Sequence, residues 1–261
     1  MSRSELALIV PIILLALFLR LWGIRWGEPY VYHPDEWEMV WPALRIVQTG
    51  DFNPHDFHKP SFLIYAETAI AKMVNLITGA SLTVERPSGM LPMEAPPEQF
   101  PYYLWGRTFV ALLGSATVFL AFLAGRTLYS SEAGLATAFL LSVLPLHVAD
   151  SHYLAVDVPA AFFATATLAF AALALRTNRT VYFLLGGLAT GLTAATKYNF
   201  GLVGVTILLA FVFTRKSPRH LADIKLLLIG ASALVGFLAA CPFSVLDFST
   251  FLQCLQFQAT Y

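Results

Sequence analysis

Long apolar stretches alternate with short polar ones along most of this chain. A helix needs about 20 apolar residues to cross the hydrocarbon core of a membrane, and Glu5–Ile24 supplies the first such stretch. Further apolar stretches follow at Leu104–Leu128, Ala133–Val148, Val156–Leu175, Val181–Ala195, Phe200–Thr214 and Ile224–Ala240. The pattern predicts an all-α, polytopic integral membrane protein with a single transmembrane domain over residues 1–261.

Two polar segments rich in proline separate the first apolar stretch from the later ones. They are Arg25–Pro60 and Ala80–Tyr103, and Ser61–Gly79 lies between them. Ser61–Gly79 is apolar but contains Glu67 and Lys72. It therefore reads as a helix that lies in the membrane surface, although a true span, with one later helix miscounted, is the alternative.

The basic residues predict the orientation in the membrane. Arg3 precedes the first span, Arg176 and Arg179 lie in one later loop, and three more lie in another: Arg215, Lys216 and Arg219. Basic loops stay on the cytoplasmic side. The N-terminus and both loops can be cytoplasmic only if Ser61–Gly79 stays outside, which makes residues 25–60 the first external loop and 80–103 the second. The polar stretches at 22–60, 149–157 and 197–199 then meet on the external face.

Composition supports a membrane protein and excludes several other classes. The chain is 57% hydrophobic and 12% charged, whereas soluble domains average about 25% charged. A net charge of +0 gives no reason to expect a nucleic-acid partner. The cysteines, Cys241 and Cys254, have no histidine near them in sequence, which favours two buried thiols.

The sequence near the two ends of the chain indicates whether a signal peptide is removed and whether the protein continues beyond Tyr261. The first apolar stretch is longer than the core of a signal peptide, which indicates an uncleaved span. The chain stops within an amphipathic pattern at Tyr261. We therefore expect the N-terminal part of a longer protein, with a natural end at Tyr261 as the alternative.

Adjacent carboxylates follow a proline in the first external loop. Pro34 favours a helix that begins at its own position, so Asp35 and Glu36 fall in the first turn. The amides and dipole of that turn favour a negative charge. Asp35 is a candidate general base, and an ordinary acidic helix start is the alternative.

The end of the same loop reads "HDFHKPSF". Lys59 stands at the start of the next apolar segment, where an ammonium group can pair with a phosphate. His55, Asp56 and His58 are candidate metal ligands, although loosely spaced surface histidines would look the same.

Charged residues also border or enter the later apolar stretches. Arg107, Asp157 and Lys197 are such residues, and charges in these places usually face a cavity or a partner. Asp157 could instead cap a helix. Lys197, like Arg20 in the first span, could instead extend to the membrane interface.

Five short motifs occur in order along nearly the whole chain. They are "HPDEW" from His33, "KPSF" from Lys59, "GRTFV" from Gly106, "DSHYLAVDVPAAFF" from Asp150 and "GLATGLTAATKYNF" from Gly187. Together they resemble the GT-C glycosyltransferases, above all the dolichyl-phosphate-mannose–protein mannosyltransferase family and its bacterial relatives, including the aminoarabinose transferases. Two positions depart from that pattern, because Ser61 replaces a proline and His152 stands where an arginine is common.

The resemblance implies a GT-C-like helix bundle with juxtamembrane helices in the first external loop. It implies inverting transfer of a sugar from a polyprenyl-phosphate donor to a protein, lipid or glycan acceptor on the outer face of a bacterial or archaeal plasma membrane. By that resemblance Asp35 is the base, and Glu36 is either its helper or a structural partner. Lys59, Arg107, Asp157 and Lys197 would serve the phosphate and the acidic site. No nucleotide cofactor is implied.

The aminoarabinose relatives add a metal to these expectations. His58 aligns with a metal-ligand position in those relatives, which implies a divalent ion. A transporter or flippase, or a non-catalytic assembly subunit on the same scaffold, is the alternative to the enzyme. The sequence leaves open the sugar, the acceptor, the length of the lipid and the oligomeric state.

Overall fold

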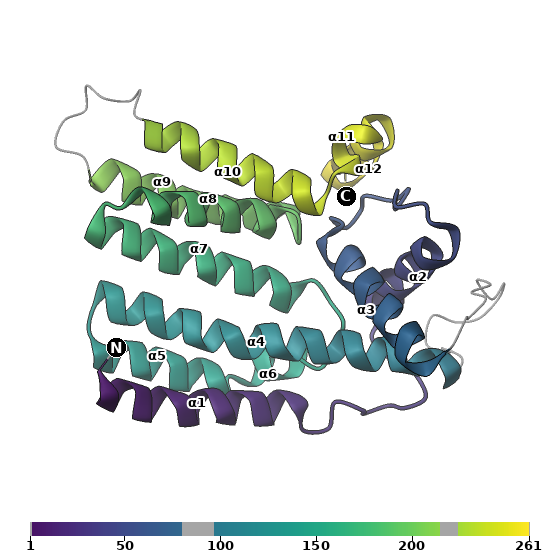
Figure 1. Cartoon of the computed structure of the whole chain (residues 1–261), viewed down its shortest axis with the longest axis horizontal. Helices are drawn as coiled ribbons and strands as arrows, with labels where there is room; N and C mark the ends of the chain where they lie inside the picture. Colours follow the sequence, from purple (N-terminus) through teal and green to yellow (C-terminus); the bar gives the residue numbers. More distant parts are fainter. Residues whose placement is uncertain (1, 80–96, 215–223, 261) are drawn as a thin grey trace.

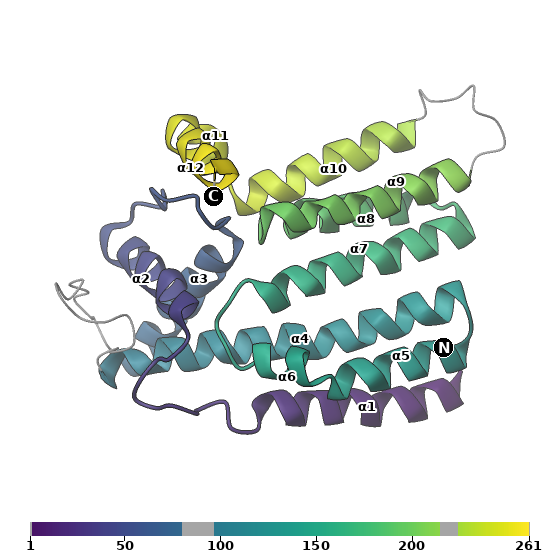
Figure 2. The same cartoon turned by 180° about the vertical axis from the view of Figure 1, so that it is seen from behind.

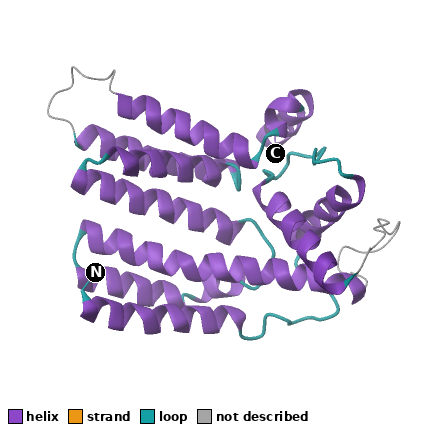
Figure 3. Ribbon diagram, viewed as in Figure 1, coloured by secondary structure: helices purple, strands orange, loops and turns teal. Residues whose placement is uncertain are grey.

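The computed structural model describes residues 2–79, 97–214 and 224–260, which form helices and no strand. Most of the helices run side by side as an elongated bundle, and a smaller group lies across one end of it (Figure 1; Figure 3). The bundle contains α1 (Arg3–Leu21), α4 (Phe100–Leu128), α5 (Ser131–Val143), α7 (Asp157–Thr177), α8 (Thr180–Ala194), α9 (Gly204–Phe213) and α10 (Ile224–Ala240). The all-α architecture expected from the sequence is confirmed.

Three of these helices are long and apolar enough to cross a membrane: α1, α4 and α7. The helices α5, α8, α9 and α10 are apolar but shorter. Leu14 and Phe18 of α1 are exposed, as expected for side chains that face lipid. The prediction of a membrane protein is therefore confirmed.

The N-terminus and several basic residues lie at the same end of the bundle (Figure 1). Glu5 of α1 accepts a hydrogen bond from Arg126 Nε at 2.7 Å. Arg176 Nη2 donates to the carbonyl of Leu128 at 2.7 Å, and Lys225 Nζ contacts Asn178 Oδ1 at 2.7 Å. This clustering agrees with a cytoplasmic position for that end, which stays a prediction. Arg215, Lys216 and Arg219 lie outside the described residues.

Proline divides one stretch that the apolar pattern had joined. We expected Ala133–Val148 to be continuous, but α5 ends at Val143 and α6 (Pro145–Asp150) begins after an extended Leu144, with φ −63° and ψ 113°. The ring of Pro145 disfavours helical geometry in the residue before it and removes an amide donor. The expectation was wrong at this point.

The stretch Phe200–Thr214 also starts differently from the expectation. A 3₁₀ segment, η2 (Tyr198–Val203), precedes α9. This segment directly follows Lys197, whose own backbone is extended at φ −152° and ψ 112°. The α-helical part is therefore only Gly204–Phe213.

The smaller group of helices lies at the end opposite the N-terminus (Figure 2). It contains α2 (Pro34–Thr49), α3 (Phe62–Thr78), α11 (Phe243–Leu246) and α12 (Phe248–Thr260). The segment expected at Ser61–Gly79 is helix α3, and Gly79 ends it in the left-handed conformation with φ 68°. Helix α3 lies oblique to the bundle (Figure 1), an arrangement that fits a helix at the membrane surface.

An apolar core joins this group to the bundle. Met39 and Leu44 of α2 and Leu63 of α3 are buried together with Tyr102 and Val110 of α4. The N-terminal part of α4 therefore extends into the end group, and a helix of 29 residues connects both parts. Of the second external loop, residues 80–96 lie outside the described residues, while 97–103 belong to η1 (Pro97–Gln99) and α4.

Glycines allow α8 and α10 to pack with their backbones in contact. A Cβ added at Gly191 would lie 2.7 Å from the backbone nitrogen of Phe237 and closer still to the carbonyl oxygen of Ala233. Gly187 would meet the carbonyl oxygen of Ile229 at 2.5 Å. Close approach at small residues is the usual basis of helix association in membranes.

We expect Gly191→Ala to lower the free energy of unfolding by about 1–3 kcal/mol, because backbone atoms of α10 cannot move aside as a side chain would. Gly230→Ala is the matched control, since no atom lies within 4 Å of an added Cβ there. Thermal unfolding of the purified protein in detergent, followed by circular dichroism, measures both. Equal midpoints for the two variants would contradict this account of α8 and α10.

Candidate functional site

A cavity of about 440 Å³ opens where the end group meets the bundle. Segments from five parts of the chain form its walls: Asp35, His58, Lys59, Pro60, Val156, Asp157, Thr196, Lys197, Tyr198, Asn199 and Gln258. Five of the predicted site residues are in this set. Asp35, His58, Lys59, Asp157 and Lys197 therefore meet at one place.

Asp35 lies in the first turn of α2, as the proline predicted. His33 is extended at φ −86° and ψ 122°, and its Nδ1 accepts a hydrogen bond from the Asp35 amide at 3.3 Å. The Asp35 side chain is one-third exposed, and its Oδ1 lies 2.8 Å from Lys59 Nζ. The helix start thus presents a partly solvated carboxylate to the cavity.

Lys59 bridges two carboxylates of α2. Its ammonium group lies 2.8 Å from Asp35 Oδ1 and 2.5 Å from Glu38 Oε2. Sequence reasoning missed Glu38. Positions three apart share a helix face, and that spacing from Asp35 is the signal that could have identified it.

Asp157 and Lys197 form the second ion pair of the cavity, with 2.7 Å between Oδ1 and Nζ. Asp157 is the first residue of α7 but makes no capping hydrogen bond, because the cap position is Val156. The capping alternative is therefore wrong. Lys197 points to Asp157, and its Nζ lies over the Phe200 ring, 5.2 Å from the centroid, so it does not simply extend toward the membrane interface.

Glu36 and Arg107 are placed differently from the other site candidates. Both side chains are 0% exposed, and Arg107 Nε and Nη2 donate to the two carboxylate oxygens of Glu36 at 2.7 and 2.8 Å. Neither residue lines the cavity. The pair is a bidentate, fully desolvated ion pair behind the helix turn that carries Asp35.

The same pair collects four segments of the chain. Arg107 of α4 also donates to the carbonyls of Ile24 and Trp26, at 3.3 and 3.1 Å. Glu36 of α2 accepts from the Leu154 amide at 2.9 Å. The loop after α1, the start of α2, the N-terminal part of α4 and the loop before α7 are therefore held together by one buried ion pair.

Glu67 of α3 is a further buried acid close to this pair. It is 0% exposed, and neither carboxylate oxygen has a hydrogen-bond partner among the described residues. Burial raises the pKa of Glu67 well above its ordinary value, and the negative charge of Glu36 adds to the increase. Both effects favour the protonated, neutral form of this carboxyl.

Arg20 does not extend to the membrane interface as the sequence suggested. Its side chain is fully buried and donates to the carbonyls of Ala16, Leu141 and Ser142 at 3.0–3.1 Å. It also contacts His147 Nδ1 at 3.0 Å. Arg20 therefore fastens α1 to the end of α5, where Pro145 leaves carbonyl groups without helical partners.

A second cavity of about 440 Å³ lies on the other side of Lys59. Its lining is more apolar and aromatic: Trp37, Glu38, Met39, Trp41, Pro42, Pro54, Asp56, His58, Lys59, Ile64 and Phe257. Lys59 and His58 belong to both cavities. Lys59, which lies between two carboxylates of α2, is therefore at the junction of the polar cavity and the aromatic cavity.

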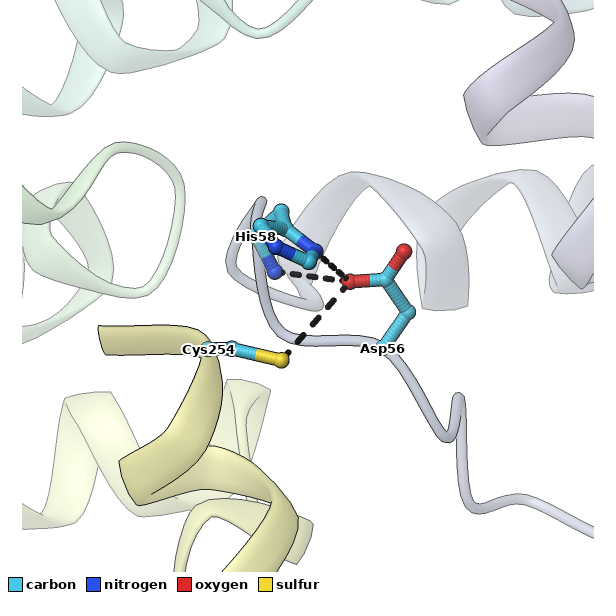
Figure 4. A group of neighbouring side chains, drawn as sticks. All are labelled: Asp56, His58 and Cys254. Atoms are coloured by element: carbon cyan, nitrogen blue, oxygen red, sulfur yellow. Dashed lines mark hydrogen bonds and ion pairs between the residues drawn. The ribbon is translucent and has the colours of Figure 1, made fainter. Parts of the chain in front are cut away.

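Asp56, His58 and Cys254 form a group that could hold a metal ion, with one ligand atom from each within 4.8 Å of the others (Figure 4). His55, the other candidate, lies apart from it and contacts Asp51 Oδ2 at 2.7 Å. Sequence reasoning missed Cys254, because nearly two hundred residues separate it from His58.

The model of the dolichyl-phosphate-mannose-protein mannosyltransferase family matches residues 104–243, which is more than half of the chain. The match contains Arg107, Asp157 and Lys197, whereas Asp35 and Lys59 precede it. No curated protein matches the chain in sequence.

A solved structure shares the fold. The oligosaccharyltransferase of Archaeoglobus fulgidus, crystallised as a complex with Zn and sulfate, is 15% identical and superposes with a TM-score of 0.56. The alignment covers 95% of this chain and 37% of the archaeal one. The chain therefore spans about a third of the length of that relative, and the GT-C-like fold expected from the sequence is confirmed.

We expect Glu36→Gln to destabilise the protein by about 3–5 kcal/mol, because it leaves the Arg107 charge buried without a partner. The double variant Glu36→Gln/Arg107→Gln should recover part of that loss. Arg25→Gln is the control, since its ion pair with Glu28 is exposed and exposed pairs contribute little to stability. Thermal unfolding in detergent compares the three, and equal losses for Glu36→Gln and Arg25→Gln would refute the buried-pair account.

Glu67 should make stability depend on pH. A carboxyl whose pKa is higher in the folded protein binds more protons when folded, so stability falls as pH rises above the unfolded value of about 4.3. Glu67→Gln removes this effect. We expect its unfolding midpoint to exceed that of the wild type at pH 8, with a difference that shrinks toward pH 4.5. Glu98→Gln changes an exposed residue and is the control, so its unfolding midpoint should differ from that of the wild type by the same amount at every pH. A difference that is equally independent of pH for Glu67→Gln would contradict the raised pKa of Glu67.

Proposed function

Because the chain belongs to the dolichyl-phosphate-mannose-protein mannosyltransferase family, we propose that it transfers a sugar from a polyprenyl-phosphate donor to an acceptor hydroxyl, with Asp35 as general base. One observation carries the proposal: the partly exposed Asp35 carboxylate shares a cavity with two lysines, Lys59 and Lys197. A carboxylate can accept a proton there, while the ammonium groups can receive a phosphate.

The proposed reaction is a single displacement. The acceptor oxygen attacks the anomeric carbon while its proton passes to a carboxylate oxygen of Asp35. The bond between the anomeric carbon and the phosphate oxygen breaks, and its electron pair leaves with the polyprenyl phosphate. Attack from the face opposite the phosphate inverts the anomeric configuration.

The charges of the cavity suit such a leaving group. Negative charge accumulates on the phosphate as the bond breaks, and pre-positioned cations stabilise it. Asp157 holds Lys197 at the cavity wall through the 2.7 Å contact. Lys59 is similarly held by Asp35 and Glu38, so both cations are oriented before a ligand arrives.

The second cavity suggests how the acceptor approaches. An inverting reaction needs the acceptor and the phosphate on opposite sides of the sugar, and the two cavities meet at Lys59 and His58. We assign the polar cavity to the phosphate and the aromatic one, with Trp37 and Trp41, to the acceptor. Both volumes are within the usual range of about 300–1,000 Å³ for ligand sites.

Glu36 and Arg107 receive a different role from the one implied by the resemblance. They contact each other rather than the cavity, so we propose that they are positioning residues that fix the first turn of α2. Asp35 then faces the cavity because its neighbour Glu36 faces the core. Successive residues of a helix point about 100° apart.

The position of the cavity fits transfer on the non-cytoplasmic side. It lies at the end of the bundle that carries α2 and α3, whereas the C-terminal ends of α4 and α7 lie at the other end (Figure 1). Arg126 and Arg176 belong to the last turns of these two helices. Basic residues remain on the cytoplasmic side. We therefore propose an N-terminus in the cytoplasm and a cavity at the external face, reached by the donor through the adjoining membrane.

We expect Asp35→Asn to lower kcat about 100- to 10,000-fold, because an amide cannot accept the acceptor proton. The measurement is mass spectrometry of glycoconjugates from cells that carry the wild-type gene, the variant or neither. Purified protein with polyprenyl-phosphate mannose as the trial donor gives the rate. Donor binding should change little.

Glu132→Gln is the control for this variant, since it removes an exposed carboxylate from the first turn of α5, far from the cavity. Its transfer rate should equal that of the wild type. Undiminished transfer by Asp35→Asn would eliminate Asp35 as the base. Movement of the lipid-linked sugar across the bilayer of proteoliposomes, without formation of a new glycosidic bond, would favour a transporter instead.

A further inference from the structure

Three side chains able to bind a transition metal meet at His58, the member of the group that lines both cavities. Asp56 and His58 belong to the loop before α3, and Cys254 belongs to α12 (Figure 4). Asp56 Oδ1 lies 2.6 Å from His58 Nδ1 and 4.0 Å from Cys254 Sγ. The first two side chains are largely exposed, with 66% and 46% accessible, so an ion can reach them from solvent.

We propose that Asp56, His58 and Cys254 bind a zinc-like divalent ion that fastens α12 onto the loop preceding Lys59. The proposal stands independently of the reaction proposed above. A thiolate, an imidazole and a carboxylate together form a set typical of zinc, because the soft sulfur ligand disfavours magnesium and calcium. Three protein ligands leave one tetrahedral position for water.

The distances require only a small adjustment. Zinc binds nitrogen and oxygen at about 2.0–2.2 Å and sulfur at about 2.3 Å, which separates tetrahedral ligands by about 3.3–3.8 Å. The Cys254–Asp56 distance of 4.0 Å is close to that range. The His58–Asp56 contact must lengthen by about 1 Å, which rotation of an exposed carboxylate provides.

Neighbouring groups already hold two of the ligands in place. The Phe57 amide donates to Cys254 Sγ at 3.4 Å, which offsets charge on a thiolate. The Phe257 ring packs edge-on against His58 with 5.0 Å between centroids. Gln258 donates to the His58 carbonyl. Outer contacts of this kind orient metal ligands and strengthen binding.

The ion would complete one wall of the site. Gln258 lines the polar cavity and Phe257 the aromatic one, and both belong to α12. His58 is the immediate neighbour of Lys59. A metal bond from Cys254 to His58 therefore fixes the two α12 side chains relative to the lysine at the junction of the cavities.

The chain offers a clean test, because Cys241 and Cys254 are its two cysteines. Cys241→Ser serves as the reference protein and leaves Cys254 as the single thiol. Purified without a polyhistidine tag and loaded with zinc, it should contain one ion per chain by elemental analysis. With cobalt it should show thiolate-to-metal charge-transfer absorption. Cys254→Ser with Cys241 intact should lose that absorption and bind zinc more than about 100-fold more weakly.

Alkylation of the thiol reports whether the ion fastens α12. In the Cys241→Ser protein, zinc should slow maleimide labelling of Cys254 at least tenfold relative to the chelator-treated sample, and adding His58→Ala should abolish the protection. Less than half an equivalent of zinc would overturn the proposal. So would equal zinc affinity after Cys254→Ser, or labelling that zinc does not slow. None of these readouts depends on sugar transfer.

Discussion

The buried ion pair between Glu36 and Arg107 is the contact on which the arrangement of the site depends. Removing two charges from water is costly, so the pair is stable only with near-ideal geometry and with its remaining polar atoms satisfied. The carbonyls of Ile24 and Trp26 and the amide of Leu154 meet that need. The positions of four segments of the chain are thereby fixed relative to one another. The position of Asp35 is fixed with them, because Asp35 is the residue next to Glu36.

The cavity combines charges that no single segment could bring together. Asp35 and Lys59 come from the end group, whereas Asp157 and Lys197 come from the turns at the ends of α7 and α8. Each lysine is held by at least one carboxylate, which keeps the cavity close to neutral before a ligand binds. In the proposed reaction, an incoming phosphate would meet oriented cations at a small reorganisation cost, which is the arrangement that favours charge-developing reactions.

Local patterns predicted much of this structure. Apolar stretches located the bundle helices, Pro34 located the start of α2, and Ser61–Gly79 was correctly expected to be helical. Where the apolar pattern failed, as at Pro145, backbone chemistry overrode hydropathy. The pairing of Glu36 with Arg107 and the position of Cys254 beside His58 were beyond prediction, because each joins segments that are far apart in the sequence. Motif order predicted that charged residues would meet, but not which of them would face the core.

The contact between α12 and the loop at 56–58 has a consequence for synthesis in the cell. The chain is made from its N-terminus, so the loop leaves the ribosome long before Cys254 and Gln258 exist. Glu36 can form its ion pair with Arg107 once α4 has been made and inserted into the membrane. The wall that α12 provides can form only later, after α10 has been made. An early intermediate would therefore display Asp35 and Lys59 in an open groove, and the cavity would acquire this wall only after α12 has been made.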